Sequence, residues 1–288
     1  MARIAIVGVG AIGGALVGLL QTTGQYELTL CTRRPMEALT VHTPQGPVQV
    51  NARNLTNLAQ AEPVDWVIVA TKTYDAEGAA KWFPALCADG AKVAVVQNGV
   101  EHRERFAPWV SEDRLLPVVI DCPTERPADG TVLVRGATLM KVEDAQLGQE
   151  FAALFTGSTA KMMLVDDFTT AAWWKLCINS VGALCAVTLQ PDRVLWSDAM
   201  DRVAREMVEE CVAVGRAEGA QLDDTMPAQV MASYRTHPAD SVNSLLADRL
   251  AGRPMEIDAR NGAIVRKGEK HGIATPMNRM AVALLQAV

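Results

Sequence analysis

The sequence predicts an α/β protein with an N-terminal Rossmann doubly wound sheet and a C-terminal all-helical domain. In the first half, short apolar runs rich in β-branched residues alternate with helical stretches. The runs are continuously apolar, as expected for parallel strands covered by helices on both faces. After Asp166 the β-branched runs disappear and helical periodicity continues to the end. We therefore expect a Rossmann domain at residues 1–166 and a helical domain at residues 167–288.

The expected strands follow from these runs in order. Residues 3–8, 26–31, 65–70 and 91–97 predict four strands of the parallel sheet. Residues 114–120 and 131–136 are expected to extend this sheet, with antiparallel strands as one option. A helix is expected directly after Gly10, and another over residues 74–88. In the second half the first two long helices should cover residues 168–187 and 197–220.

Bulk composition restricts the function classes. The chain has 288 residues, of which 49% are hydrophobic, and a net charge of -6. Nucleic acid requires a dense basic face, which this chain lacks, so no nucleic-acid partner is expected. No stretch reaches the roughly 20 apolar residues of a membrane span, and no leader pattern precedes the first strand. We expect a cytoplasmic protein without a membrane partner, whose six scattered cysteines are mostly small buried hydrophobes.

A glycine-rich turn, GVGAIG at residues 8–13, follows the first expected strand. In such a turn Gly8 permits the tight bend, Gly10 lets a pyrophosphate approach the backbone, and Gly13 allows close helix packing. The helix that begins at Ala11 and Ile12 would direct its free amides at the phosphates. A glycine turn without a ligand is the alternative. The position between a strand and a helix favours a dinucleotide site.

The end of the second expected strand distinguishes between two cofactors. NAD-binding proteins usually place Asp or Glu there to hold the ribose 2′-hydroxyl, whereas a 2′-phosphate requires cations. The chain has Thr32, Arg33 and Arg34 at this point and no acid. Arg33 or Arg34 could bind the phosphate as a guanidinium fork, and Thr32 could add a hydroxyl. A solvated arginine pair is the alternative, but the absent carboxylate favours NADP(H).

A polar stripe interrupts the first apolar helix of the second domain. Lys175 and Asn179 are four residues apart, so they share one helical face. Lys175 either extends to water or faces a cleft. Glu256, in a late polar segment, is a chemically sensible carboxylate partner. A lysine can protonate a ketone oxygen while a nearby carboxylate keeps it charged and oriented.

Five segments together resemble the ketopantoate reductase (2-dehydropantoate 2-reductase) family over nearly the whole chain. They occur in the order and spacing of that family. They are the glycine turn, TKTYD at residues 71–75, QNG at residues 97–99, the helix with Lys175 and Asn179, and the block from Ser244 through Asp248, Glu256 and Asp258 to Gly262.

The resemblance implies a role for each matched residue. Lys175 would be the general acid and Glu256 would bind the substrate and orient that lysine. The implied substrate-binding residues are Asn98, Asn179 and Ser244, with Asn98 also near the nicotinamide. The implied cofactor-binding residues include Lys72 and, at the 2′-phosphate, Arg33. From the residues alone, Asn98-Gly99 also fits an ordinary turn, Ser244 a helix N-cap and Glu256 a helix start.

The resemblance implies NADPH-dependent reduction of a small 2-oxo acid, with 2-dehydropantoate and its conversion to pantoate in pantothenate biosynthesis as the leading choice. The family carries a second asparagine where this chain has Ala183, so the pocket would lack one amide. The segment around Arg126 lacks the family's histidine-containing pattern. The alternatives are a different oxo acid, oxidation of a secondary alcohol, or a non-catalytic NADP(H)-binding sensor. The four histidines show no paired spacing, so no metal is expected, and the helical domain is compatible with a homodimer.

Overall fold

The structure is a computed structural model that describes residues 1–288, and it contains two compact units. The first unit comprises residues 1–97 and 102–166, and the second comprises residues 98–101 and 167–288. A short segment from the first half of the sequence therefore belongs to the second unit. No pattern in the sequence predicted that this segment would belong to the second unit.

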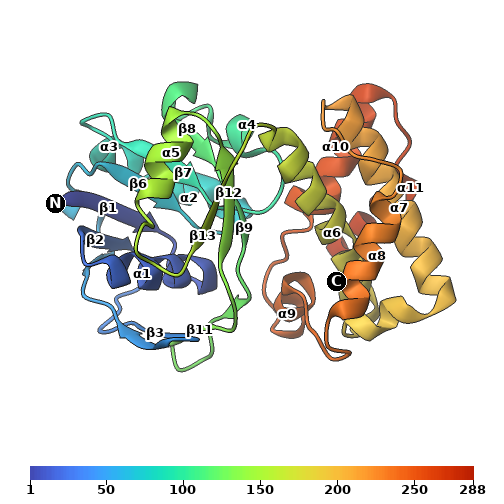
Figure 1. Ribbon diagram of the computed structural model, residues 1–288, viewed down its shortest axis with the longest axis horizontal. Coiled ribbons are helices and arrows are strands. Elements are labelled where there is room, and N and C mark those ends of the chain that lie inside the picture. The colour runs from blue at the N-terminus through green and yellow to red at the C-terminus, as the bar shows by residue number, and fades with distance from the viewer. The chain divides into compact units, whose positions relative to one another are not determined.

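A six-stranded sheet forms the centre of the first unit (Figure 1). Its order is β5-β2-β1-β6-β7-β8 and every neighbouring pair is parallel. The order runs outward from β1 in both directions, as in a doubly wound Rossmann sheet. The bounds are β1 (Ala2–Val7), β2 (Tyr26–Cys31), β5 (Arg53–Leu55), β6 (Trp66–Val69), β7 (Lys92–Val95) and β8 (Leu115–Pro117).

Both faces of this sheet are buried. Ile4 and Ile6 of β1 point into one apolar cluster and Ala5 and Val7 into another, and all four are at most 2% exposed. This double burial explains why the strands are continuously apolar in sequence. The sheet is accompanied by helices α1 (Ala11–Thr23), α2 (Ala76–Ala80), α3 (Phe83–Leu86), α4 (His102–Phe106) and α5 (Gln146–Ala153), and by the short 3-10 turns η1 (Leu58–Gln60), η2 (Thr73–Asp75) and η3 (Glu112–Arg114).

Two further small sheets lie in the same unit. One has the order β10-β11-β3-β4 and the other β13-β12-β9. The first packs on α1, where a Cβ atom on Gly14 would come within 2.5 Å of Val132. The bounds are β3 (Thr40–Thr43), β4 (Gly46–Gln49), β9 (Val119–Asp121), β10 (Thr124–Glu125), β11 (Val132–Val134), β12 (Leu139–Glu143) and β13 (Lys161–Val165).

Three expectations about this unit need correction. β8 does extend the central sheet, but as a parallel strand, and its run continues into β9 of another sheet. The strand expected at residues 131–136 is β11, which belongs to a separate sheet. The expected helix over residues 74–88 is divided into η2, α2 and α3, and Pro84 stands in the first turn of α3, where its missing N–H costs nothing.

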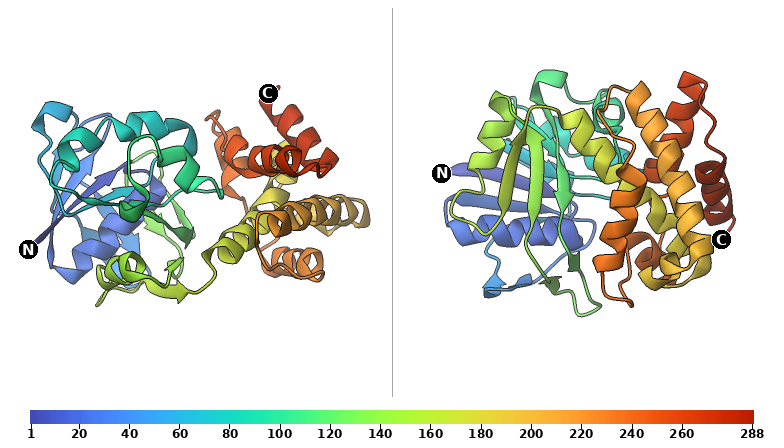
Figure 2. Two further views of the ribbon diagram at one scale, coloured as in Figure 1. Left: turned by 90° about the horizontal axis from the view of Figure 1, so that it is seen from above. Right: turned by 45° about the vertical axis from the view of Figure 1, so that its right-hand side comes forward.

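The second unit is all-helical and is built around α6 (Phe168–Thr188), which contacts most of the other helices (Figure 2). Asp167 caps α6, because its side chain accepts a hydrogen bond from the Thr170 amide at 2.8 Å. The remaining elements are η4 (Asp192–Trp196), α7 (Asp198–Ala217), α8 (Met226–Thr236), α9 (Ser244–Leu250), the π-helical turn η5 (Asp258–Gly262), α10 (Ala263–His271) and α11 (Pro276–Gln286).

One expectation about α6 was wrong. By length and composition alone, this helix is long and apolar enough to cross a membrane, although no such stretch was expected. In the structure, 61% of its most apolar window is buried inside the protein. Trp173, Leu176 and Val181 are among its core residues. The apolar character of α6 is thus accounted for by the core of the second unit.

Candidate active site

The glycine-rich turn has the geometry of a phosphate cradle. Gly8 has a φ of +92°, and a Cβ atom there would come within 2.7 Å of Thr71. A Cβ on Gly13 would lie 2.0 Å from the carbonyl oxygen of Gly8, so the helix can approach the turn only with glycine at this position. A Cβ on Gly10, in contrast, would meet no atom within 4 Å. The turn is therefore closed at Gly8 and Gly13 and open at Gly10.

The first turn of α1 offers its amides to a ligand. Gly10 is the N-cap and carries no side chain that could accept a hydrogen bond from the helix. No acidic residue lies in the first turn either, so the amides that follow Gly10 and the positive end of the helix dipole are not neutralised from within the helix. Such an end binds anions, and the site fits the pyrophosphate of a dinucleotide. Ala11 and Ile12, which begin this helix, are partly exposed.

The residues after β2 form a compact turn. The Thr32 hydroxyl donates to the carbonyl oxygen of Arg34 at 2.7 Å and accepts from the Asn54 amide at 2.8 Å. Its proton is thus used to shape the turn. Arg33 is exposed, with 89% of its side chain accessible, and its guanidinium lies 4.0 Å from Asp75. Burial raises the pKa of Cys31, just before the turn, to about 12, so this thiol adds no negative charge beside a phosphate.

A further cation lies against the glycine-rich turn, and it was not predicted from the sequence. The Arg126 guanidinium donates to the carbonyl oxygen of Val9, and it contacts the Met36 sulfur at 3.2 Å. It also donates to Gly130 at 3.3 Å. Arg126 therefore links the glycine turn to the loop after β2. The partners Val9 and Arg126 are 117 residues apart, and no local pattern reports a contact over that distance.

In the second unit, side chains from three separate segments form a connected polar chain. The Asn179 amide donates to the Asn98 side-chain oxygen at 3.4 Å, and the Asn98 amide donates to a Glu256 carboxylate oxygen at 3.2 Å. Glu256 is only 4% exposed, whereas Asn98 and Asn179 are half-buried. Lys175, one helical turn before Asn179 on α6, is half-buried as well. All five predicted catalytic and substrate-binding residues, with Ser244 as the fifth, thus belong to this unit, and these two hydrogen bonds join Asn179, Asn98 and Glu256.

The Asn98-Gly99 turn is held tightly in the second unit. Gly99 has a φ of +96°, and a Cβ there would lie 2.4 Å from the carbonyl oxygen of Ala259 in η5. Two residues later, Glu101 accepts from Arg266 of α10 at 2.7 and 3.2 Å. A bidentate pair of this kind fixes orientation as well as distance. These contacts explain how a segment from the first half of the sequence presents Asn98 to residues of α6 and to Glu256.

The segment η5 is fixed from the other side by buried amides. The Asn261 side chain donates to the Ser180 carbonyl oxygen at 3.0 Å and to the Asn278 side chain at 2.9 Å. Asn278 in turn donates to the Met207 carbonyl oxygen at 3.1 Å. Asn261 and Asn278 are fully buried. This network connects η5 with α6, α7 and α11, so Glu256 precedes a rigid turn.

The structure distinguishes between some of the alternatives for single residues. Asn243, not Ser244, caps α9, with its side chain accepting from the amides of Leu245 and Leu246. Ser244 is exposed at the first helical position. Ala183 has no exposure and belongs to the apolar core of the second unit. Lys72 is partly exposed and precedes η2, after β6.

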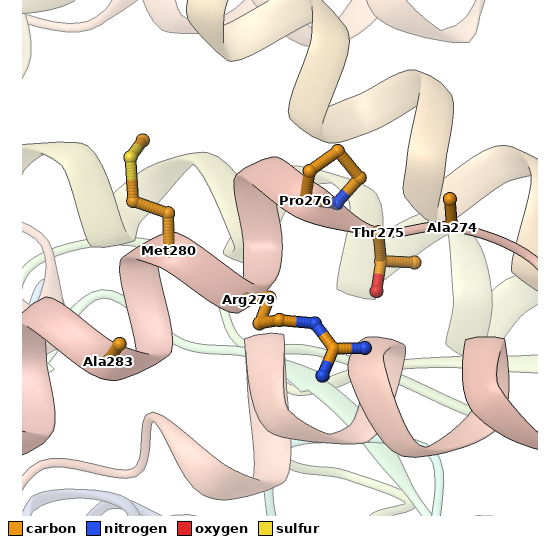
Figure 3. A pocket seen from close by; sticks show the side chains of 6 residues that line it. All are labelled: Ala274, Thr275, Pro276, Arg279, Met280 and Ala283. Carbon is orange, nitrogen blue, oxygen red and sulfur yellow. The ribbon is translucent and has the colours of Figure 1, made fainter.

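One surface pocket contains none of the predicted site residues. A shallow surface pocket at the start of α11 is lined by Ala274, Thr275, Pro276, Arg279, Met280 and Ala283 (Figure 3). Its single charged side chain, Arg279, pairs with Glu269 at 2.9 Å. No group of three or more His, Cys, Asp or Glu side chains is arranged to hold a metal ion.

Comparison with known proteins determines the family. The family described as "Ketopantoate reductase PanE/ApbA" matches residues 4–146, and "Ketopantoate reductase PanE/ApbA C terminal" matches residues 167–288. The chain belongs to the ketopantoate reductase family. It is 47% identical to the 2-dehydropantoate 2-reductase of Caulobacter vibrioides over 287 residues, which cover 100% of this chain and 99% of the relative. It is 37% identical to the enzyme of the same name from Mycobacterium tuberculosis, covering 99% and 97%.

Solved structures of the family agree with the fold. The 2-dehydropantoate 2-reductase of Geobacter metallireducens GS-15 is similar, with a TM-score of 0.93, 27% identity, and coverage of 99% of this chain and 100% of that one. A ketopantoate reductase from Ralstonia eutropha JMP134 has a TM-score of 0.90 and 31% identity, with coverage of 99% and 97%. The predicted Rossmann sheet with a C-terminal helical domain is confirmed.

Proposed function

We propose that this protein reduces 2-dehydropantoate to pantoate with NADPH, and thus is an oxidoreductase of the CH–OH class in pantothenate biosynthesis. The observation that carries the proposal is the polar chain from Asn179 through Asn98 to Glu256, beside Lys175 on the same helix as Asn179. Full-length similarity to relatives named 2-dehydropantoate 2-reductase supports the same reaction.

The proposed roles follow from the chemistry of each group. When bound, the nicotinamide supplies a hydride to C2 of the oxo acid. Lys175 donates a proton from Nζ to the 2-oxo oxygen as negative charge develops there. Glu256, a buried carboxylate, keeps this ammonium charged and oriented and binds the substrate. Asn98, Asn179 and Ser244 bind the substrate's polar groups, and Asn98 is fixed for this by Asn179 and Glu256.

The cofactor roles are assigned to the first unit. Gly8, Gly10 and Gly13, with the amides of Ala11 and Ile12, hold the pyrophosphate. Arg33 binds the 2′-phosphate of NADPH, and Lys72 lies near the cofactor. Thr32 shapes the turn that presents Arg33. Arg126, beside Val9 and Met36, adds positive charge at the same loops.

Turnover tests the reaction. NADPH oxidation is followed by absorbance with 2-dehydropantoate beside a panel of other small 2-oxo acids. A kcat/KM of about 10⁴ M⁻¹s⁻¹ or above with 2-dehydropantoate supports the proposal. A clearly better substrate elsewhere in the panel would replace 2-dehydropantoate. No turnover with any oxo acid, together with tight NADPH binding, would favour a non-catalytic sensor.

The Arg33→Ala variant tests the choice of cofactor. Loss of a guanidinium–phosphate contact should raise the Kd for NADPH about tenfold or more and leave that for NADH unchanged. The matched control is Arg53→Ala, which removes an exposed arginine of the same sheet edge that pairs with Glu62. Fluorescence titration measures both constants. Equal effects of Arg33→Ala on the two cofactors would contradict the assignment.

Location and assembly are part of the proposal. We place the protein in the cytoplasm, where its six free cysteines stay reduced. Two copies are proposed to form a homodimer, and light scattering at working concentration measures this directly. Neither nucleic acid nor a membrane is proposed as a partner.

A further inference from the structure

A buried arginine lies behind one of the proposed substrate residues. Arg260 is 4% exposed, and its Nη2 donates to the Ser244 hydroxyl oxygen at 2.6 Å. Ser244 itself is exposed. The guanidinium thus reaches from the interior of the second unit to a surface hydroxyl that belongs to the proposed substrate site.

Burying this cation is costly, and its surroundings compensate only in part. Its Nε atom is buried and has no hydrogen-bond partner. Burial lowers the pKa of Arg260, while the charges of Glu256 and Asp248 act in the opposite direction. An apolar side chain of similar volume would avoid the cost of desolvation. Stability alone therefore does not account for an arginine here, and its neighbours Ser244 and Glu256 indicate a role in the site.

The hydrogen bond determines what Ser244 can do. Because the hydroxyl oxygen accepts from a guanidinium, the hydroxyl proton is directed to another partner. A partner that accepts and does not donate, such as a carboxylate, suits this arrangement. The positive charge behind the hydroxyl strengthens the same preference. Position 183 supplies no side-chain amide, because it is an alanine, and Ala183 is buried in the apolar core.

We propose that Arg260 is a positioning residue that makes Ser244 a hydrogen-bond donor to the substrate carboxylate and thereby selects anionic oxo acids. The inference rests on the proposed function, because it assigns Ser244 to the substrate. It concerns recognition of the acid and not the transfer of the proton. The effect should therefore appear in KM more than in kcat.

The first experiment compares Arg260→Met with wild type in steady-state assays with 2-dehydropantoate and with its neutral amide. KM for the acid should rise about tenfold or more, kcat should change less than about threefold, and the preference for acid over amide should fall by a similar factor. Arg260→Lys should restore part of that preference. Arg253→Met is the control, because Arg253 pairs with the same Asp248 at 2.9 Å but is 58% exposed.

The second experiment separates positioning from a purely structural role. In a Ser244→Ala background, Arg260→Met should add less than about twofold to KM, since both act through one hydroxyl. Ser244→Ala alone should already lower the preference for acid over amide. That variant tests the inference even if Arg260→Met does not fold.

The outcomes distinguish the inference from the function. If wild type turns over 2-dehydropantoate but Ser244→Ala or a folded Arg260→Met keeps the full preference for the acid, the inference is wrong and the function stands. Independent, multiplicative effects of the two substitutions would also overturn it. If wild type turns over no oxo acid, the proposed function fails and this inference fails with it.

Discussion

The two units offer different kinds of chemical groups to their proposed ligands. In the first unit the predicted contacts come from the backbone, because Gly8, Gly10 and Gly13 allow a turn whose amides are open to an anion. In the second unit the proposed contacts come from side chains, which are joined by hydrogen bonds from Asn179 through Asn98 to Glu256. A backbone site depends on the absence of side chains at a few positions. A side-chain site depends on the packing of distant segments around each polar group.

Within the first unit, alanine substitutions at Gly13 and Gly10 should differ strongly in their effect on the free energy of unfolding. Gly13→Ala places a Cβ 2.0 Å from the Gly8 carbonyl oxygen, so we expect a loss of about 3 kcal/mol or more in the free energy of unfolding. Gly10→Ala is the matched control, since its Cβ meets nothing within 4 Å and stability should stay within about 0.5 kcal/mol. Urea denaturation measures both. Equal stabilities would mean that the turn is not closed at Gly13.

In the second unit, truncation of a single polar side chain should lower the activity while the protein remains folded. Asn98→Ala removes a donor to Glu256 and an acceptor for Asn179, which should lower kcat/KM for 2-dehydropantoate about 10- to 100-fold. NADPH affinity should fall much less than kcat/KM. Asn51→Ala, an exposed asparagine of the first unit, is the control. If kcat/KM for Asn98→Ala equals that of wild type, the polar chain has no part in the reaction.

His102 should add a modest pH dependence to the first unit. It is buried, its Nε2 lies 2.8 Å from the Gln97 carbonyl oxygen, and burial lowers its pKa to about 4. The unfolded chain takes up the proton near pH 6.5, so stability is fully present above that pH and is lost as the pH falls towards 4. Between pH 7 and 5.5 the loss should be about 1 kcal/mol.

Thermal unfolding over that pH range checks the His102 prediction. His102→Gln keeps a side-chain donor near Gln97 but cannot titrate, so its pH dependence should be flatter than that of wild type. Parallel curves for the two proteins would show that another group is responsible.

The sequence was informative where a single local pattern determines geometry. The glycine turn, the apolar strands and the helix bearing Lys175 and Asn179 could all be predicted, because each depends on residues within about ten positions. The small sheets could not, since β11 pairs with β3 across about 90 residues and its short run resembles any edge of the main sheet. Residues 98–101 belong to the second unit, where Gly99 packs against Ala259. No local sequence pattern predicts this contact.

The residues of the candidate site also divide into those that the sequence could indicate and those that depend on contacts between separate segments. Glu256 was a candidate from the residues alone, and the family resemblance added Asn98 and Ser244, but neither indicated the hydrogen bond that joins Asn98 to Glu256. Arg126 and Arg260 were not assigned any role from the sequence. Each makes a hydrogen bond to a residue outside its own sequence segment, and an arginine in an isolated segment looks like a solvated surface charge.

The most direct test compares one variant from each unit in the same two assays. Lys175→Ala and Gly10→Ala are each measured for NADPH affinity and for kcat with 2-dehydropantoate at saturating NADPH. We predict that Lys175→Ala keeps the wild-type Kd and loses about 10²- to 10⁴-fold in kcat, whereas Gly10→Ala weakens NADPH binding and keeps most of kcat. Unchanged turnover in Lys175→Ala, or unchanged NADPH affinity in Gly10→Ala, would contradict the division between a backbone cofactor site and a side-chain catalytic site.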